Sequence, residues 1–518
     1  MTPFSALDRR HFLKLSAGAS ALASTLGLSH AVAATVTTRD DIVALSALDL
    51  SRAIRTGDVS CHEVMTAYLD HIGRYNPTYN AIVAIQPRDR LLDQATQADD
   101  DLAKGNYRGW MHGFPHAVKD LSATRGIVTT RGSALSKDWI PDVDAIFVER
   151  LRQAGAILIG KTNVPEFGLG SQSYNGVYGT TRNAYDHSLC AGGSSGGAAV
   201  GLASQMLPVA YGSDMMGSLR NPAAFNNVIG FRPSQGRVPH GPSGEMFYQQ
   251  LGYEGPMGRN VVDTARLLAT MAGFDSRVPL SLETDTSRYV ESLKMETRGL
   301  RVAWLGDFGG YLATEPGVLE VCQEGLKHLV AIGASVEEVT VDFSMEELWQ
   351  TWLTLRHFLI AGGLGRLYDV AENRPQMKPE VIWEIEGGLT LSAMQVYAAS
   401  NARSRWYQTL DRLFDTFDVV ALPSAQVFPF DADIHWPKEI DGRSMDTYHR
   451  WMEVVIAGTL SGCPVINVPA GFDPRGRPMG IQLIGRMHQD LKVLNIAHAY
   501  EQASGLLAQR PTLIPGAS

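Results

Sequence analysis

Two short clusters rich in glycine and serine, separated by an apolar run, constrain this 518-residue chain more than any other feature. They are residues 192–197 and 212–218, and both lie within the stretch 190–239. Glycine allows positive φ and lets a ligand approach main-chain N–H groups closely. A serine among such glycines is exposed for chemistry, and neighbouring amides can bind a developing oxyanion. Either cluster alone is equally consistent with an ordinary glycine-rich turn.

Taken together with segments elsewhere, the clusters resemble the signature of the amidase signature family. The resemblance includes GSSGG at 193–197, GSD at 212–214, GSLR at 217–220 and GFRPSQGRV at 230–238. It continues in GFPHAVKD at 113–120, GKTNVPEF at 160–167, GPMGR at 255–259 and CPVINVPAG at 463–471. The similarity therefore extends from about residue 40 to about residue 505, nearly the whole chain.

The resemblance implies a catalytic set of Ser218 as nucleophile, Ser194 as bridging serine and Lys119 as base. It also implies a cis peptide bond before Ser194. The expected oxyanion hole consists of the backbone N–H groups of Met215, Met216, Gly217 and Ser218. Nearby structural roles are expected for Ser195, which supports the turn, and for an ion pair between Asp214 and Arg220.

The chemistry of this set is coherent. Ser218 must lose a proton to attack an amide carbonyl, and Ser194 can pass that proton on to Lys119. A lysine acts as a base only when it is neutral, so burial must lower its pKa from about 10.4 towards the working pH. The resemblance therefore predicts a buried Lys119 and hydrolysis through an acyl-enzyme. Without the serine clusters, Lys119 would more simply be read as the partner of an acid such as Asp120.

The sequence departs from the commonest family pattern at Met216, where glycine is usual. Backbone donors survive this change provided that φ at Met216 is negative. The side chain then lies either in the wall of the pocket or in the core beneath it. We expect Met216 to affect substrate shape more than catalysis.

Two other motifs offer different functions. Residues 192–196 satisfy GxSxG, the nucleophile elbow of α/β-hydrolases, which requires a downstream acid and histidine. Seven histidines follow it, so an exported serine esterase stays open as the mechanistic alternative. Residues 155–162 match the Walker A pattern GxxxxGK[ST]. Their middle residues form an apolar strand rather than a phosphate-wrapping turn, so we expect Lys161 to be structural.

The N-terminus is typical of an export signal. Arg9 and Arg10 precede a modest apolar stretch and the small residues 31–34, which together resemble a bacterial Tat signal. The stretch is shorter than the roughly 20 strongly apolar residues that span a membrane. We expect residues 1–34 to be removed, no later membrane segment, and a periplasmic location.

Composition limits the partners. The net charge is −9 with no long basic run, which argues against nucleic acid or an anionic membrane as a partner. The cysteines Cys61, Cys190, Cys322 and Cys463 are widely spaced without CxxC, so we expect free, buried thiols and no zinc site. Among them, only Cys190 is expected near the site. We expect no cofactor and no metal, and a homodimer is compatible with the sequence.

Alternating apolar strands and amphipathic helices predict an α/β fold. The resemblance specifies an α/β/α sandwich around a large mixed β-sheet, in one domain over residues 35–518. Within it we place the catalytic core at about 105–260. A helical, aromatic-rich region at about 300–416 is expected to select the substrate, and six of the nine tryptophans lie after residue 340.

The sequence therefore predicts a metal-free amidase that cleaves a carbon–nitrogen bond in a small-molecule amide, with an aryl or bulky acyl group favoured. The alternatives are the serine esterase above and a periplasmic binding protein that kept the fold but lost its activity. The intact Lys119, Ser194 and Ser218 argue against the second.

Overall fold

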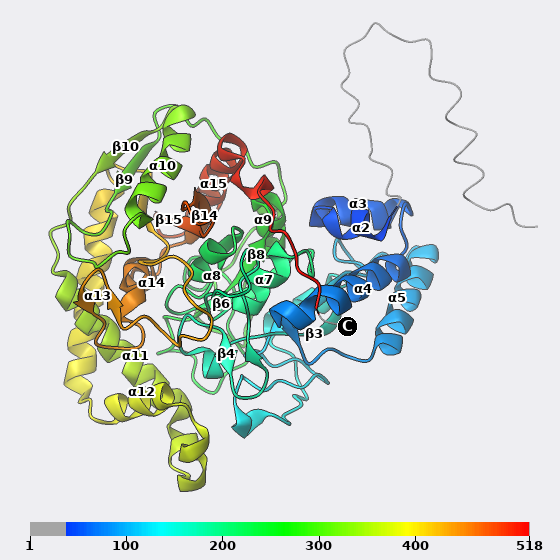
Figure 1. Cartoon of the computed structure of the whole chain (residues 1–518), viewed down its shortest axis with the longest axis horizontal. Helices are drawn as coiled ribbons and strands as arrows, with labels where there is room; N and C mark the ends of the chain where they lie inside the picture. Colours follow the sequence, from blue (N-terminus) through cyan, green and yellow to red (C-terminus); the bar gives the residue numbers. More distant parts are fainter. Residues whose placement is uncertain (1–37, 517–518) are drawn as a thin grey trace, which may run out of the picture. The chain divides into compact units, whose positions relative to one another are not determined.

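The computed structural model describes residues 38–516, so the predicted export segment at 1–34 lies outside the described residues. An eight-stranded sheet forms the centre of the fold (Figure 1). Its strands, in spatial order, are β10 (Ser335–Glu338), β9 (Arg301–Trp304), β11 (Val419–Pro423), β15 (Pro478–Gly485), β14 (Val465–Phe472), β7 (Ile229–Arg232), β8 (Tyr253–Gly258) and β6 (Ala210–Asp214).

This sheet is mixed. Strands β10, β9 and β11 pair in parallel, whereas every pairing from β11 through β15, β14, β7 and β8 to β6 is antiparallel. The predicted large mixed sheet is confirmed. Sequence patterns did not identify β7 and β8, because these strands are buried on both faces and carry glycine and proline instead of alternating polar residues.

A second, three-stranded sheet has the order β1 (Ile82–Val83), β3 (Ile157–Thr162) and β2 (Pro115–Lys119). β2 and β3 are parallel and fully buried. The Walker A match at 155–162 therefore falls on a buried strand, as expected from its apolar middle residues. Lys119 is the last residue of β2, a position from which its side chain reaches the serine clusters described below.

Two short antiparallel ladders lie in loops: β4 (Tyr174–Asn175) with β5 (Gly179–Thr180), and β12 (Glu439–Ile440) with β13 (Arg443–Ser444). The α-helices of the described residues are α2 (Arg39–Ala44), α3 (Ala47–Thr56), α4 (Cys61–Tyr79), α5 (Arg88–Ala103), α6 (Ile146–Gln153), α7 (Gly196–Ala203), α8 (Arg220–Phe225), α9 (Val261–Met271), α10 (Val318–Ala331), α11 (Met345–Tyr368), α12 (Pro379–Leu389), α13 (Ala393–Leu413), α14 (Ile456–Ser461) and α15 (Asp490–Ser504).

Helices cover both faces of the sheet because side chains alternate along its strands. On β15, Gly480 and Gln482 face α8: a Cβ on Gly480 would lie 2.9 Å from the Cβ of Ala224, and Gln482 accepts a hydrogen bond from Arg220. The intervening Ile481 faces α10, where it lies near Gly325. This alternation produces the α/β/α sandwich, as predicted.

Apolar residues recur at helical spacing over residues 42–56, a pattern that predicts one helix. The structure instead divides this stretch between α2 and α3, and Ser46 begins the second helix. The Ser46 side chain accepts a hydrogen bond from the backbone N–H of Asp49 at 3.1 Å. A serine cap of this kind satisfies a helix-end donor and favours a new start over continuation.

The region expected to select the substrate has two structural parts. Residues 301–338 form β9, α10 and β10, which extend one edge of the main sheet. Residues from 345 on form α11–α13, and Figure 1 shows these yellow-green helices together at one side of the fold. Trp349, Trp352 and Trp406 are fully buried there, so much of the aromatic content is core. No helix within 38–516 is both long and apolar enough to cross a bilayer.

Candidate active site

The two glycine- and serine-rich clusters lie against each other in the fold. The cluster 192–197 leads into α7, and the cluster 212–218 starts in β6 and ends just before α8. The backbone N–H of Ser195 donates to the carbonyl oxygen of Ser218 at 3.2 Å, which joins the clusters directly. Gly197 permits close packing, since a Cβ there would lie 2.3 Å from the backbone nitrogen of Asn163. The bond Gly193–Ser194 is cis, as the resemblance implied.

Lys119 is buried beneath these clusters. Its Nζ donates to Ser194 Oγ at 2.9 Å and to Ser195 Oγ at 2.8 Å. It also lies within hydrogen-bond distance of Ser213, at 3.0 Å from Oγ and 3.1 Å from the carbonyl oxygen. Lys119 therefore has no carboxylate in direct contact among the described residues, and the pairing with Asp120 does not occur. Asp120 instead accepts from the backbone N–H of Thr130 at 3.0 Å.

Burial lowers the pKa of Lys119 from its ordinary value of 10.5 to about 7. The negative charges of Glu254 and Asp214 act in the opposite direction and are outweighed. Near neutral pH, a substantial fraction of this amine is therefore uncharged and carries a lone pair that can accept a proton from a hydroxyl. This electrostatic state is the one predicted for a lysine base.

The predicted ion pair between Asp214 and Arg220 is present and fully buried. Arg220 donates from Nε and Nη2 to the two carboxylate oxygens at 3.0 and 2.9 Å. Burial alone would raise the pKa of Asp214, but Arg220 and then Arg232 lower it well below its usual range. Asp214 also accepts from the backbone N–H groups of Gly217 and Leu219 at 2.9 and 3.1 Å. The pair therefore fixes the turn that carries Ser218.

This turn changes the expected oxyanion hole. The N–H of Gly217 already donates to Asp214, so it is not free for a substrate oxygen. In residues 38–516, by contrast, no acceptor takes the N–H groups of Met215, Met216 and Ser218. Met216 is not among the residues with positive φ, which meets the condition set by its side chain. Three of the four expected donors are thus available.

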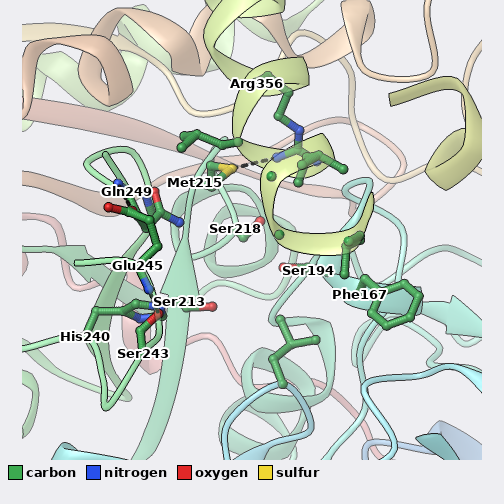
Figure 2. Close-up of a pocket in the computed structure, with 18 of the residues that line it drawn as sticks. Phe167, Ser194, Ser213, Met215, Ser218, His240, Ser243, Glu245, Gln249 and Arg356 are labelled. Carbon is green, nitrogen blue, oxygen red and sulfur yellow. Dashed lines mark hydrogen bonds between the residues drawn. The ribbon is translucent and has the colours of Figure 1, made fainter. Parts of the chain in front are cut away.

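A cavity of about 430 Å³ opens above this turn (Figure 2). Ser194, Ser213 and Ser218 form part of its polar lining, and Phe358 and Ile360 of α11 form part of its apolar lining. The structure therefore brings Lys119, Ser194 and Ser218 to one site. It contains the hydrogen bond from Lys119 to Ser194, but no direct bond between the hydroxyls of Ser194 and Ser218 occurs in the described part of the chain.

Met215, and not Met216, presents its side chain to the cavity. Met215 lines the cavity, and its Sδ accepts a hydrogen bond from Arg356 at 3.0 Å (Figure 2). Met216 is 2% exposed and is absent from the lining. Of the two positions considered for the Met216 side chain, the structure therefore selects the core, and Met215 shapes the cavity. Side-chain direction at a turn depends on φ and ψ, which the sequence does not specify.

Other residues of the site were not singled out by sequence. Ser213 was visible only as a member of its cluster. Glu254 and His240 line the cavity, and His240 Nδ1 lies 2.6 Å from Glu254 Oε1. Arg356 also lines it, from α11. Glu254 directly precedes the GPMGR motif, which is a weak signal, and nothing in the sequence distinguishes Arg356.

The structure also bears on the nucleophile elbow. His240 and Glu254 supply a histidine and an acid near the cavity, but no histidine within 38–516 hydrogen-bonds to Ser194 or Ser195. The basic group next to Ser194 is Lys119. The geometry therefore favours a lysine base over a histidine base.

The remaining candidates are structural. Lys161 donates to the carbonyl oxygen of Ser122 at 2.7 Å and to Thr124 Oγ1 at 2.8 Å, so it holds a loop. Burial lowers its pKa to about 7 as well. All four cysteines are free and buried, as predicted. Cys190 precedes the first cluster but does not line the cavity.

Comparisons with known proteins agree over most of the chain. The model of the Amidase family matches residues 63–494. An acylamidase of Rhodococcus erythropolis is 32% identical over 475 residues, which cover 90% of this chain and 97% of that protein. One glutamyl-tRNA(Gln) amidotransferase subunit, from Thermosynechococcus vestitus, is 32% identical over 488 residues, which cover 90% of this chain and 99% of that protein.

Solved structures show the same similarity. A bacterial aryl acylamidase of the amidase signature family has a TM-score of 0.83 at 28% identity, and the match covers 90% of this chain and 99% of that one. The native peptide amidase from Stenotrophomonas maltophilia has a TM-score of 0.75 at 25% identity, with 89% and 97% covered.

Proposed function

The chain belongs to the amidase family and is an enzyme that hydrolyses amide carbon–nitrogen bonds, and on this premise we propose that Ser218, Ser194 and Lys119 carry out the reaction. The observation that supports these roles best is Lys119 itself. It is fully buried, its pKa is lowered to about 7, and it is bonded to Ser194 in the wall of the cavity that also exposes Ser218.

In the first step, neutral Lys119 accepts a proton from Ser194, which accepts one from Ser218. The Ser218 oxygen then bonds to the amide carbon, and the electron pair of the carbonyl moves to its oxygen. In this proposal the N–H groups of Met215, Met216 and Ser218, which have no acceptor within residues 38–516, stabilise that oxyanion. The substrate must bring the Ser194 and Ser218 hydroxyls into hydrogen-bond contact, as often happens only when a complex forms.

In the second step, the carbon–nitrogen bond breaks and the proton returns through Ser194 to the leaving nitrogen. Without that proton the nitrogen would leave as an amide anion, so the relay must act as acid as well as base. Water then attacks the acyl-enzyme by the reverse path, which frees the acid and restores Ser218. Ser195 and Ser213 touch Lys119 and hold its amine towards Ser194.

We propose that the substrate is a small-molecule amide with an aryl or bulky acyl group. The cavity has room for such a group, and Phe358, Ile360 and Leu364 of α11 give part of its lining an apolar character. The names of two relatives, an acylamidase and an aryl acylamidase, describe substrates of this class.

A fluorophosphonate probe and a panel of anilides, aliphatic amides, peptide amides and esters test this proposal. We expect the probe to label Ser218, and we expect Ser218→Ala to abolish both labelling and amide hydrolysis. A label on Ser194 or Ser195 with an essential His240 would establish the elbow mechanism instead. Absence of both labelling and turnover in the folded protein would support the inactive binding protein.

We further propose that the protein is exported through the twin-arginine pathway, on the evidence of Arg9 and Arg10 and the small residues 31–34. Replacing both arginines with lysine should leave uncleaved precursor in the cytoplasm, measured by fractionation and mass spectrometry of the N-terminus. Unchanged periplasmic activity in that variant would contradict the proposal.

A further inference from the structure

Arg356 presents a fixed guanidinium to the active-site cavity. It comes from α11, lines the cavity and is only 5% exposed. Its Nε donates to Glu384 Oε1 at 2.9 Å, and its Nη2 donates to Tyr448 Oη at 3.1 Å. Its Nη1 donates to the thioether of Met215, the contact drawn in Figure 2. The amidase mechanism gives this side chain no role.

The guanidinium of Arg356 has more N–H donors than there are strong acceptors around it in the described residues. Arginine carries five N–H groups, and a thioether is a weak acceptor. The three bonds above therefore leave two N–H groups without an acceptor among the described residues, and a third that is weakly held. A buried donor without a partner is costly, so an oxygen acceptor from a ligand would be favoured here.

The carboxylates around the cavity already have hydrogen-bond or ion-pair partners. Asp214 is paired with Arg220, and Glu254 accepts from Tyr211 and contacts His240. Glu245 accepts from backbone N–H groups of its own turn. The lining carboxylates are thus already engaged.

Arg131 also lines the cavity, and its guanidinium lies 4.5 Å from the ring centre of Trp139. No hydrogen-bond acceptor for this guanidinium occurs within the described chain. The two cavity arginines therefore keep unused hydrogen-bond donors.

We propose that Arg356 binds a carboxylate of the substrate, at a position remote from the amide that Ser218 attacks. The preferred substrates are then aryl or acyl amides that carry a carboxylate. A guanidinium fork matches a carboxylate in shape and can donate two parallel hydrogen bonds to it. This inference rests on the proposed function of the site and narrows its substrate class.

Glu384 acts as a positioning residue for Arg356. It is fully buried, does not line the cavity, and also accepts from Tyr448 Oη at 2.5 Å. The pair joins α11 to α12, so loss of Arg356 would also disturb helix packing. A test must therefore separate carboxylate binding from this structural role.

Matched substrates provide that separation. On the acyl side, the mono-4-nitroanilide of glutaric acid is compared with pentanoyl 4-nitroanilide, which lacks the carboxylate. On the amine side, 4-acetamidobenzoate is compared with 4-acetamidotoluene. In at least one pair, wild-type kcat/KM should be higher for the carboxylate member. Arg356→Gln should lower the ratio of kcat/KM for the carboxylate member to kcat/KM for the neutral member about 10- to 100-fold, mainly through KM. This is the range expected for a hydrogen bond to a charged group.

Two further variants control for folding. Glu384→Gln removes the charge that positions the guanidinium but leaves the guanidinium itself, so it should lower the ratio less than Arg356→Gln does. Arg356→Lys keeps the charge without the fork and should give an intermediate ratio; it decides the test if Arg356→Gln does not fold. Active enzyme is counted by fluorophosphonate labelling in every sample.

Equal losses on both members of each pair would overturn the inference and leave Arg356 structural. A wild-type enzyme without preference for either carboxylate would also overturn it, while hydrolysis of the neutral anilides would still support the proposed function. Failure to hydrolyse any amide would instead refute the proposed function.

Discussion

The lowered pKa of Lys119 makes a quantitative prediction about the pH dependence of hydrolysis. Lys119 has to be neutral to accept a proton, so kcat/KM should rise with pH through the pKa of about 7 and then level off. At pH 5 only about 1% of such a lysine is neutral, so activity should be about 100-fold below its plateau. An ordinary lysine with a pKa of 10.5 would be neutral in only about 1 of 3,000 molecules at pH 7. The difference corresponds to about 5 kcal/mol, which burial supplies.

Glu254→Gln tests whether the surroundings of Lys119 set the pKa of this lysine. The negative charge of Glu254 raises the pKa of Lys119 against the effect of burial. Its removal should therefore lower that pKa and move the rising limb to lower pH. Glu245→Gln is the matched control, because Glu245 lines the same cavity but is not among the charges that act on Lys119. It should leave the limb in place.

The assay is the pH profile of kcat/KM for a neutral anilide between pH 4.5 and 10, with active sites counted by fluorophosphonate labelling. His240 also lines the cavity; burial lowers its pKa, but the contact with Glu254 outweighs this and raises it. His240→Gln should therefore keep the limb if Lys119 produces it. A limb that disappears with His240, that has its midpoint near 10, or that moves to higher pH in Glu254→Gln would refute the reasoning.

Three further predictions concern the relay and the turn. Because residues that act as a unit are non-additive, Lys119→Ala/Ser218→Ala should be little worse than Ser218→Ala in single-turnover assays, and additive losses would argue against a shared relay. Met215→Ala should alter the preference among bulky anilides, because Met215 lines the cavity. Met216→Ala should keep that preference and lower the free energy of unfolding by about 2–5 kcal/mol, because Met216 is buried outside the lining. The reverse result would show that Met216 shapes the site. Gly217→Ala should lower kcat more than tenfold, because φ at Gly217 is +79° and the new Cβ would lie 2.9 Å from Val455. The control Gly57→Ala, where φ is +77° and no atom lies within 4 Å of the new Cβ, should leave kcat unchanged. Equal kcat values for the two variants would contradict this prediction.

The sequence by itself determined the family, the sheet-and-helix class and the catalytic candidates. This was possible because Lys119, Ser194 and Ser218 lie in short motifs whose glycines and serines are recognisable without knowledge of the fold. The buried strand at 157–162 could also be recognised, because four consecutive apolar residues do not form a phosphate-binding turn. Likewise, the pair of Asp214 and Arg220 is local, six residues apart, and was predicted from that proximity.

Only the tertiary structure decided what surrounds these residues. Arg356 reaches the cavity from a helix 138 positions after Ser218, and no motif marks it. The sequence could not show that Asp214 accepts a hydrogen bond from the N–H of Gly217, or that Met215 rather than Met216 lines the cavity, because both depend on backbone angles within one turn. The pKa of Lys119 is likewise a property of its burial. It arises only when β2, β6 and the two clusters, distant in sequence, exclude water from the amine.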